Sequence, residues 1–186
     1  MEKPYQSTAP TEGSSTFTIS EAALAECRMV LGRYPAEYSK SAMLPILHIV
    51  QADNGGWLSV AAMNAVADLL KVQYIEVYEV ATFYSMYHLQ PVGKHVLDVC
   101  HTVPCMLRGA DDVIAHIEKR LGIKEGETTA DGRFTLRAVQ CLGSCGTAPM
   151  LQCGAKYHEH LTMEKVDELI DNLGSEPQRS NYTDRS

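Results

Sequence analysis

The chain has 186 residues, enough for one large domain or two small ones. Sixteen Lys and Arg residues against 23 Asp and Glu residues give a formal net charge of −7 at pH 7. A chain this acidic repels phosphate backbones and anionic lipid, and no basic patch offsets the repulsion, so we expect no nucleic-acid binding. The longest uncharged windows, 54–67 and 80–93, are shorter than the roughly 20 residues of a bilayer span, so we expect no direct membrane insertion.

Residues 1–19 and 175–186 are expected to be disordered tails, because they are rich in small and polar residues. Residues 1–19 also lack the apolar stretch of a signal peptide, and no Arg precedes Arg28, so neither secretion nor mitochondrial import is expected. In a cytoplasmic chain thiols stay reduced, and clustered cysteines there more often bind metal or carry out redox chemistry. The spacing of the six cysteines is therefore the main evidence for function.

Residues 20–91 have the apolar periodicity of four short helices, which predicts a small helical bundle domain. Ser20 and Ser59 are predicted to cap the first and third helices, and Pro45 must lie in the first turn of the second or kink it. The predicted helices run from Ser20 to Gly32, Ser41 to Ala52, Ser59 to Leu70 and Ile75 to Tyr87.

Residues 92–174 change to a mixed pattern, so the whole chain is expected to be α+β. The order is strand, helix, strand, two-residue hairpin and helix, which is the arrangement of a thioredoxin-like core. The predicted strands are His95–Val99, Phe134–Gln140, Met150–Cys153 and Lys156–His158, and the predicted helices are Ala110–Leu121 and the segment that Thr162 caps.

Four cysteines form two pairs, each directly after a predicted strand. Cys100 and Cys105 have the spacing C-x4-C, and Cys141 and Cys145 have the spacing C-x3-C. If a crossover helix links the two strands, the strands are parallel and their carboxyl ends lie at one edge of the sheet. The four thiols are thereby expected to meet in space.

Four thiolates can hold either a structural zinc ion or an iron–sulfur cluster. Structural zinc sites usually have tight C-x2-C spacing, so these wider loops favour a two-iron cluster. Gly143 supports this interpretation because glycine lets backbone N–H groups approach sulfur, and Pro104 stiffens the other loop. A redox disulfide between Cys100 and Cys105 is the remaining functional competitor, but its spacing differs from the C-x2-C of such dithiols.

The other cysteines and the histidines give weaker signals. Cys27 lies on an apolar helix face and Cys153 in a hairpin strand, so we expect both to be packing residues. His101 is expected in a loop beside the cluster, and His158 and His160 are expected to be solvated. No dinucleotide fingerprint or phosphate-binding glycine loop is present in the sequence, so no NAD or FMN site is expected on this chain.

At these residues the sequence resembles the family of small two-iron ferredoxin subunits of NADH-quinone oxidoreductase (respiratory complex I), known as the E subunits. The stretches that carry the resemblance are 33–35, 56–59, 79–84, 91–94, 99–105, 141–145 and 148–150. The resemblance implies one [2Fe-2S] cluster, bound as cofactor and metal centre by Cys100, Cys105, Cys141 and Cys145. It also implies a thioredoxin-like ferredoxin domain at 92–174 after the helical domain at 20–91.

The same resemblance implies an electron-transfer subunit of the NADH dehydrogenase module. Its cluster would exchange electrons with FMN in a partner flavoprotein, the F-type subunit, which also holds the NADH site. The iron–sulfur subunit of that module is a second expected partner. The implied location is cytoplasmic and bacterial, in a peripheral arm attached to the inner membrane through other subunits. The alternative is the equivalent diaphorase subunit of an NAD-linked hydrogenase or formate dehydrogenase.

Three details need the structure. Relatives often have Val-Asn after the last cysteine, where this chain has Gly146-Thr147, so hydrogen bonding near the sulfurs is expected to differ. Pro149 is a candidate for a cis proline, because the thioredoxin-like folds that the chain resembles often place one just before the hairpin strand, but the sequence does not decide the isomer of the Ala148–Pro149 bond. A competing adaptor role rests on the segment 79–84, in which bundle packing is the favoured explanation for Val80 and Phe83.

Overall fold

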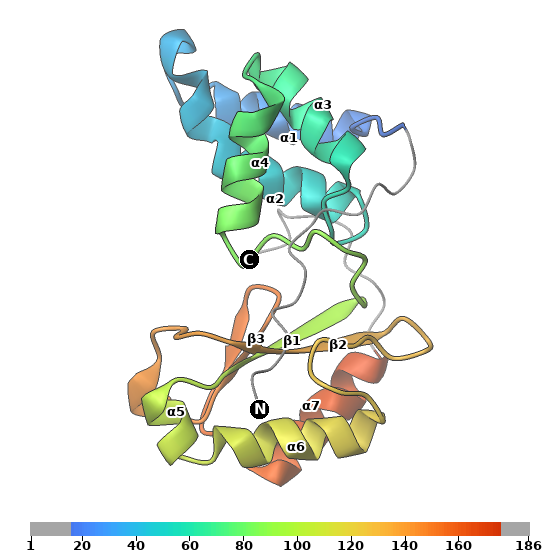
Figure 1. The fold of residues 1–186 in the computed structure, drawn as a ribbon, viewed down its shortest axis with the longest axis vertical. Helices are drawn as coiled ribbons and strands as arrows, with labels where there is room; N and C mark the ends of the chain where they lie inside the picture. The colour runs from blue at the N-terminus through green and yellow to red at the C-terminus, as the bar shows by residue number, and fades with distance from the viewer. Residues whose placement is uncertain (1–15, 176–186) are drawn as a thin grey trace. The chain divides into compact units, whose positions relative to one another are not determined.

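The computed structural model describes residues 16–175, which form two compact units (Figure 1). One unit is helical and extends to Pro91, and the other is mixed α and β and starts at Val92. The α+β class predicted from the sequence is confirmed. Each unit has its own buried apolar cluster, so each is described separately.

Four α-helices and one 3-10 helix build the first unit around a single core. Buried side chains from all four α-helices meet there, among them Cys27, Leu47, Met63 and Val77. The elements are α1 (Glu21–Leu31), η1 (Ala36–Ala42), α2 (Met43–Asp53), α3 (Val60–Leu70) and α4 (Tyr74–Phe83). The predicted small bundle is therefore present, with Pro45 in the first turn of α2, where its missing N–H costs no hydrogen bond.

Both predicted serine caps are confirmed. The Ser20 hydroxyl accepts a hydrogen bond from the Ala23 N–H at 3.2 Å, and the Ser59 hydroxyl accepts one from the Ala62 N–H at 3.2 Å. These bonds satisfy N–H groups that have no partner within the first turn of a helix. Ser20 is also bound to the carboxylate of Asp53, with its hydroxyl donating at 2.6 Å, so the start of α1 is fastened to the end of α2.

Three predictions for this unit are wrong in detail. The fourth helix ends at Phe83 instead of Tyr87, because Tyr84 adopts extended backbone angles. Phe83 is 79% exposed and does not pack in the bundle, whereas Val80 does contact the core. Phe17 and Ile19 also contact the core, although the composition of 1–19 predicts a disordered tail. The rest of the predicted tails lies outside the described residues, apart from Ser175, which ends the last helix.

The second unit is a four-stranded sheet with helices on one face (Figure 1). The strand order is β2-β1-β3-β4; β1 and β2 are parallel, and the other neighbours are antiparallel. The elements are β1 (His95–Cys100), α5 (Val103–Leu107), α6 (Ala110–Leu121), β2 (Phe134–Val139), η2 (Cys145–Thr147), β3 (Leu151–Cys153), β4 (Lys156–His158) and α7 (Met163–Ser175). Every predicted strand and helix of this unit is present.

Alternate residues of the strands face α6 and α7. Leu97 and Leu136 are fully buried, and they join Ile117 of α6 and Val166 of α7 in one cluster. This packing fixes the strand register, because a slip of one residue would turn the apolar side chains to the other face. The same register positions the cysteines, because Cys100 is paired with Val139 and both parallel strands end at the same edge of the sheet.

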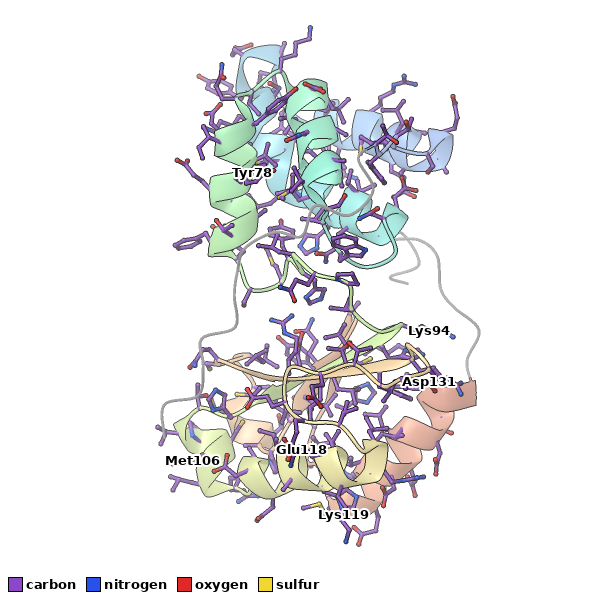
Figure 2. The ribbon with its side chains drawn as sticks, turned by 45° about the vertical axis from the view of Figure 1, so that its right-hand side comes forward. Tyr78, Lys94, Met106, Glu118, Lys119 and Asp131 are labelled. Carbon is purple, nitrogen blue, oxygen red and sulfur yellow. The ribbon has the colours of Figure 1, made fainter. Side chains whose placement is uncertain are left out.

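The sequence pattern did not predict the helix α5 or the 3-10 helices η1 and η2. Val103–Leu107 forms the short helix α5, so Cys105 lies on a helix and not in an irregular loop. Thr102 precedes the helix with extended backbone angles, and Pro104 sits in its first turn, which is a common position for proline. The exposed side chains of α5 include Met106, labelled in Figure 2.

Candidate metal centre

Cys100 and Cys105 form the buried half of the candidate centre. Cys100 is the last residue of β1, and Cys105 is in the first turns of α5. Their side chains are 2% and 1% exposed, and they pack with Ala110, Ala148 and Met150. The Ala148–Pro149 bond, whose isomer the sequence left open, is cis. The backbone therefore holds two thiols in apolar surroundings at the end of the parallel strand pair.

Cys141 and Cys145 form the exposed half. They follow β2 on a loop in which Gly143 has a φ of +80°, the left-handed conformation that glycine adopts without strain. The Gly143 N–H donates to the Cys141 sulfur at 3.4 Å, and the Cys141 and Cys145 sulfurs are 4.0 Å apart. The glycine thus has the role predicted for it, because the turn brings a backbone donor to a sulfur.

The two halves are joined by direct interactions. The Leu142 N–H, from the second loop, forms a hydrogen bond with Cys100, and the Thr102 hydroxyl lies 3.4 Å from the same sulfur. A charge on Cys100 contributes to the raised pKa of Cys145, and a charge on Cys145 contributes to the raised pKa of Cys105. The two pairs lie at the same edge of the sheet, because parallel strands end at a common edge.

The thiols differ in how readily they ionise. Burial, and then the neighbouring Cys100, raises the pKa of Cys105 to about 11. Burial also opposes ionisation of Cys100, but hydrogen bonds from Thr102 and Leu142 outweigh it and lower the pKa. The pKa of Cys145 is raised by its hydrogen bond with Cys141 and by the charge of Cys141. Four thiolates this close together repel one another, so they would persist only around a strong positive charge.

The donor set fits a [2Fe-2S] cluster in its chemistry, since thiolates and backbone N–H donors to sulfur are what such clusters use. Within residues 16–175, no three His, Cys, Asp or Glu side chains are grouped so as to hold a single metal ion. The cysteines instead form two pairs at one edge of the sheet, and none of the six cysteines is in a disulfide.

The hairpin after the second loop supplies contacts that the sequence analysis did not find. The Tyr157 hydroxyl, on β4, donates to the Leu142 carbonyl at 2.8 Å. The Glu159 carboxylate accepts hydrogen bonds from the Ser144 and Thr147 hydroxyls. The only sequence signal was the departure at Gly146-Thr147, which pointed to altered hydrogen bonding without naming a partner.

The other singled-out residues lie away from this cluster or at its margin. Cys27 is fully buried in the helical core, where burial raises its pKa to about 11, so its prediction as a packing residue is confirmed. Cys153 packs against the core of the second unit, as predicted. His101 is in a loop and His160 is exposed, but His158 is partly buried, which lowers its pKa.

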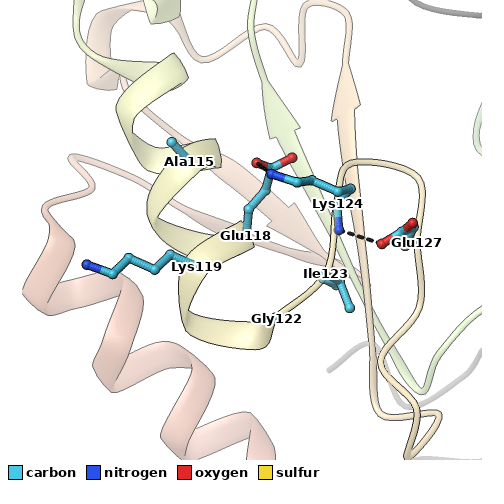
Figure 3. A pocket seen from close by; sticks show the side chains of 7 residues that line it. All are labelled: Ala115, Glu118, Lys119, Gly122, Ile123, Lys124 and Glu127. Atoms are coloured by element: carbon cyan, nitrogen blue, oxygen red, sulfur yellow. Dashed lines mark hydrogen bonds and ion pairs between the residues drawn. The ribbon is translucent and has the colours of Figure 1, made fainter.

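A surface pocket at the end of α6 offers no competing site (Figure 3). Its carboxylates already accept hydrogen bonds: Glu118 from the Lys124 ammonium at 3.0 Å, and Glu127 from the Lys124 N–H at 2.7 Å. These bonds tie the loop after α6 to the helix. Because α6 returns from the cysteine edge to the start of the sheet, the pocket is at the opposite edge.

Comparison with known proteins places the chain in one family. Residues 27–174 match the model of the thioredoxin-like [2Fe-2S] ferredoxin family. The chain belongs to this family. The thioredoxin-like fold and the resemblance to the E subunits of NADH-quinone oxidoreductase are confirmed.

The curated relatives are subunits of one enzyme. A Rickettsia felis protein, named as the E subunit of NADH-quinone oxidoreductase, is 45% identical over 163 residues, which cover 88% of this chain and 98% of the relative. A Rickettsia prowazekii protein of the same name is 44% identical over 156 residues, which cover 84% and 88%. This chain is therefore related to oxidoreductase subunits along nearly its whole length.

A solved structure shows the same fold. A chain of an NAD+-reducing [NiFe]-hydrogenase in the H2-reduced state superposes with a TM-score of 0.63 and 20% identity, covering 73% of this chain but only 22% of that chain. The air-oxidised form of that enzyme gives a TM-score of 0.62. No helix within residues 16–175 is long and apolar enough to span a membrane.

Proposed function

We propose that this chain is the electron-transfer subunit of an NADH dehydrogenase module and carries one [2Fe-2S] cluster on Cys100, Cys105, Cys141 and Cys145. The observation that supports the proposal is the position of the two cysteine pairs: one starts at the last residue of β1 and the other follows β2, and these parallel strands end at one edge of the sheet. The family and the curated relatives support the cofactor and the type of enzyme. A bound cluster supplies reversible storage of one electron.

The residues of the chain have separate tasks in this function. Apolar packing around Cys100 and Cys105 keeps water from one side of the centre, which strengthens electrostatic interactions there. The N–H groups of Gly143 and Leu142 are directed at sulfurs, where they stabilise negative charge that is added on reduction. Cys141 and Cys145 are exposed, so the second loop is the side from which an electron donor can approach.

We place the electron donor on a partner chain. In this proposal a flavoprotein subunit holds FMN and oxidises NADH, and a cluster on the four cysteines of this chain would exchange single electrons with that FMN. The other iron–sulfur subunit of the module is the second partner, and the assembly is a peripheral arm on the cytoplasmic side of a bacterial inner membrane. The hydrogenase or formate dehydrogenase assignment is the alternative, and the proteins that co-purify with the chain distinguish the two.

A pair of cysteine variants tests the assignment in the full-length chain. Cys141→Ser should lose the cluster, whereas Cys27→Ser should retain it because Cys27 lies in the helical core. Iron and sulfide analysis, the visible spectrum and the EPR signal after reduction measure retention. A colourless wild-type protein with one zinc ion, or equal cluster loss in both variants, would refute the assignment.

The exposed Phe83 favours a second, docking function for the helical unit. It is 79% exposed at the end of α4, where burial against a partner would remove apolar surface from water. If docking alone is the role of the chain, an assembly built with the cluster-free Cys141→Ser variant should oxidise NADH with an artificial acceptor at the wild-type rate. A lowered rate, with assembly intact, would favour electron transfer through the cluster.

A further inference from the structure

The segment that follows β4 contacts the loop that carries Cys141 and Cys145, although it supplies none of the four cysteines. Residues 144–147 include Cys145 and the 3-10 turn η2. The Thr147 hydroxyl lies 2.6 Å from Glu159 Oε1, and the Ser144 hydroxyl donates to the same oxygen. One carboxylate oxygen thus joins both ends of the turn that carries Cys145.

The backbone supports the same arrangement. The His160 N–H donates to the Thr147 carbonyl at 2.8 Å, and the Thr147 N–H donates to the Ser144 carbonyl at 3.1 Å. Glu159 therefore lies next to a backbone bridge between its own segment and the loop. The two hydroxyl oxygens are 2.8 Å apart, and the Thr147 hydroxyl also lies 3.0 Å from the Ser144 carbonyl oxygen. Each hydroxyl has a single hydrogen, so a hydrogen that is donated within this group of oxygens is not available to a sulfur.

This hydrogen-bond pattern has a chemical consequence for the sulfurs. Hydroxyls that donate to Glu159 cannot donate to a neighbouring thiolate, although Ser144 directly precedes Cys145. The carboxylate also adds a fixed negative charge beside the loop, and adding an electron to a nearby cluster is less favourable next to such a charge. Both effects oppose reduction.

We propose that Glu159 is a positioning residue that fixes the Cys145 turn through Ser144 and Thr147 and lowers the reduction potential of the centre. The proposal rests on the proposed function, because it concerns the cluster that Cys145 would hold. Glu159 acts through the two hydroxyls and is not a ligand.

The test compares variants of the full-length, cluster-loaded chain. Glu159→Gln removes the charge but keeps an oxygen acceptor, and Glu159→Ala removes both. In an EPR-monitored redox titration, we expect the reduction potential of both variants to be higher than that of wild type. The shift should be larger in Glu159→Ala, because the Ser144 and Thr147 hydroxyls lose their acceptor. Glu127→Gln is the matched control, because Glu127 also accepts a hydrogen bond but lies beside the pocket at the other edge of the sheet.

Hydrogen–deuterium exchange of the loop amides gives a readout that is independent of the potential. Residues 144–147 should exchange faster in Glu159→Ala and in a Ser144→Ala, Thr147→Val double variant than in wild type, while Glu127→Gln should match wild type there. If the Glu159→Ala chain does not fold, the double variant and Glu159→Gln carry the test.

The outcomes separate the two proposals. A wild-type chain without a [2Fe-2S] signal overturns the proposed function. If the wild-type signal is normal, two results overturn only the role of Glu159. One is a reduction potential of Glu159→Gln equal to that of the Glu127→Gln control, and the other is hydrogen–deuterium exchange of 144–147 in the double variant that is unchanged from wild type. A fall in thermal stability without a shift in potential also overturns it, because that result describes a residue that only supports the fold.

Discussion

Gly93, just before β1, is the position at which a single methyl group should disturb the fold most directly. A Cβ atom built on Gly93 would lie 2.8 Å from the Phe134 carbonyl carbon, 2.9 Å from the Phe134 nitrogen and 3.0 Å from the Arg133 carbonyl carbon. All three are backbone atoms, so no side chain can rotate away, and β1 and β2 must separate. The Gly93 N–H also donates to the buried Thr135 hydroxyl at 2.6 Å, a bond that this separation would lengthen.

We expect Gly93→Ala to lower the free energy of unfolding of the second unit by about 1–3 kcal/mol, the usual range for an added methyl group in a packed site. Because the unit contains both cysteine pairs, the variant should also lose iron faster. Urea unfolding, monitored by hydrogen exchange of the β1 and β2 amides, measures the loss of stability. The decay of the visible spectrum in the presence of a chelator measures the loss of iron.

Gly146→Ala is the matched control for this prediction. A Cβ atom built on Gly146 would meet no atom within 4 Å, and the residue has no positive φ, although it lies directly beside Cys145. The control should therefore unfold within about 0.5 kcal/mol of wild type. A Gly93→Ala variant that is as stable as Gly146→Ala would refute the argument, since it would show that the strands separate at no measurable cost.

Three further predictions concern the helical unit. Ser59→Ala should destabilise it by about 1 kcal/mol in urea unfolding, because the buried Ser59 hydroxyl caps α3; equal stability would show the cap to be dispensable. Hydrogen bonds from Lys40 and the Gln73 N–H lower the pKa of Glu76 below its ordinary value of 4.5. The ionised Glu76 carboxylate therefore stabilises the fold at pH values above 4.5, and this stabilisation is lost as the pH falls through the lowered pKa. Unfolding curves of wild type and Glu76→Gln should converge there, and a gap that grows on acidification would contradict this. Phe83→Ala should leave the stability of the chain within about 0.5 kcal/mol of wild type, because Phe83 is exposed, but should weaken assembly with the partner in pull-down assays; lost stability with unchanged assembly would contradict a docking role.

Local patterns were enough to predict most of the elements. Ser20 and Ser59 precede apolar residues at helical spacing, and the caps form because a serine oxygen can reach the first unpaired N–H groups. The alternation of Phe134, Leu136 and Ala138 likewise predicted β2, since one face of the sheet is buried under helices. These features depend on neighbours within a few residues, which a sequence shows directly.

The end of α4 could not be predicted because distant contacts decide it. The apolar spacing continues to Tyr87, but Tyr87 is buried with its hydroxyl donating to the Leu44 carbonyl of α2 at 2.9 Å. The next residue is also fixed, since the Gln51 side chain accepts from the His88 N–H at 2.7 Å. Tertiary contacts with α2 thus replace the last turn that periodicity favoured.

The same distinction applies to the candidate centre. The spacing singled out the four cysteines, and the parallel strands explain why both pairs lie at one edge of the sheet. Cys105 was nevertheless placed in a loop, because a five-residue helix is too short to show a period. Tyr157 and Glu159 were not singled out either, since their contacts with 142–147 depend on how the hairpin returns.

The strand order explains why that return reaches the cysteine loops. Leu151 pairs with Val99, so β3 starts at the edge where β1 ends, and His158 pairs with Leu151, so β4 ends at that edge again. The ends of β1, β2 and β4 therefore meet at one edge, and the residues directly after β4 lie against the loop after β2. The turn at Gly154 is at the other end of the hairpin, but it sets the register of β4, and the hydrogen bonds to Ser144 and Thr147 depend on that register. A shift of β4 by one residue would turn Glu159 to the opposite face and leave both hydroxyls without this acceptor.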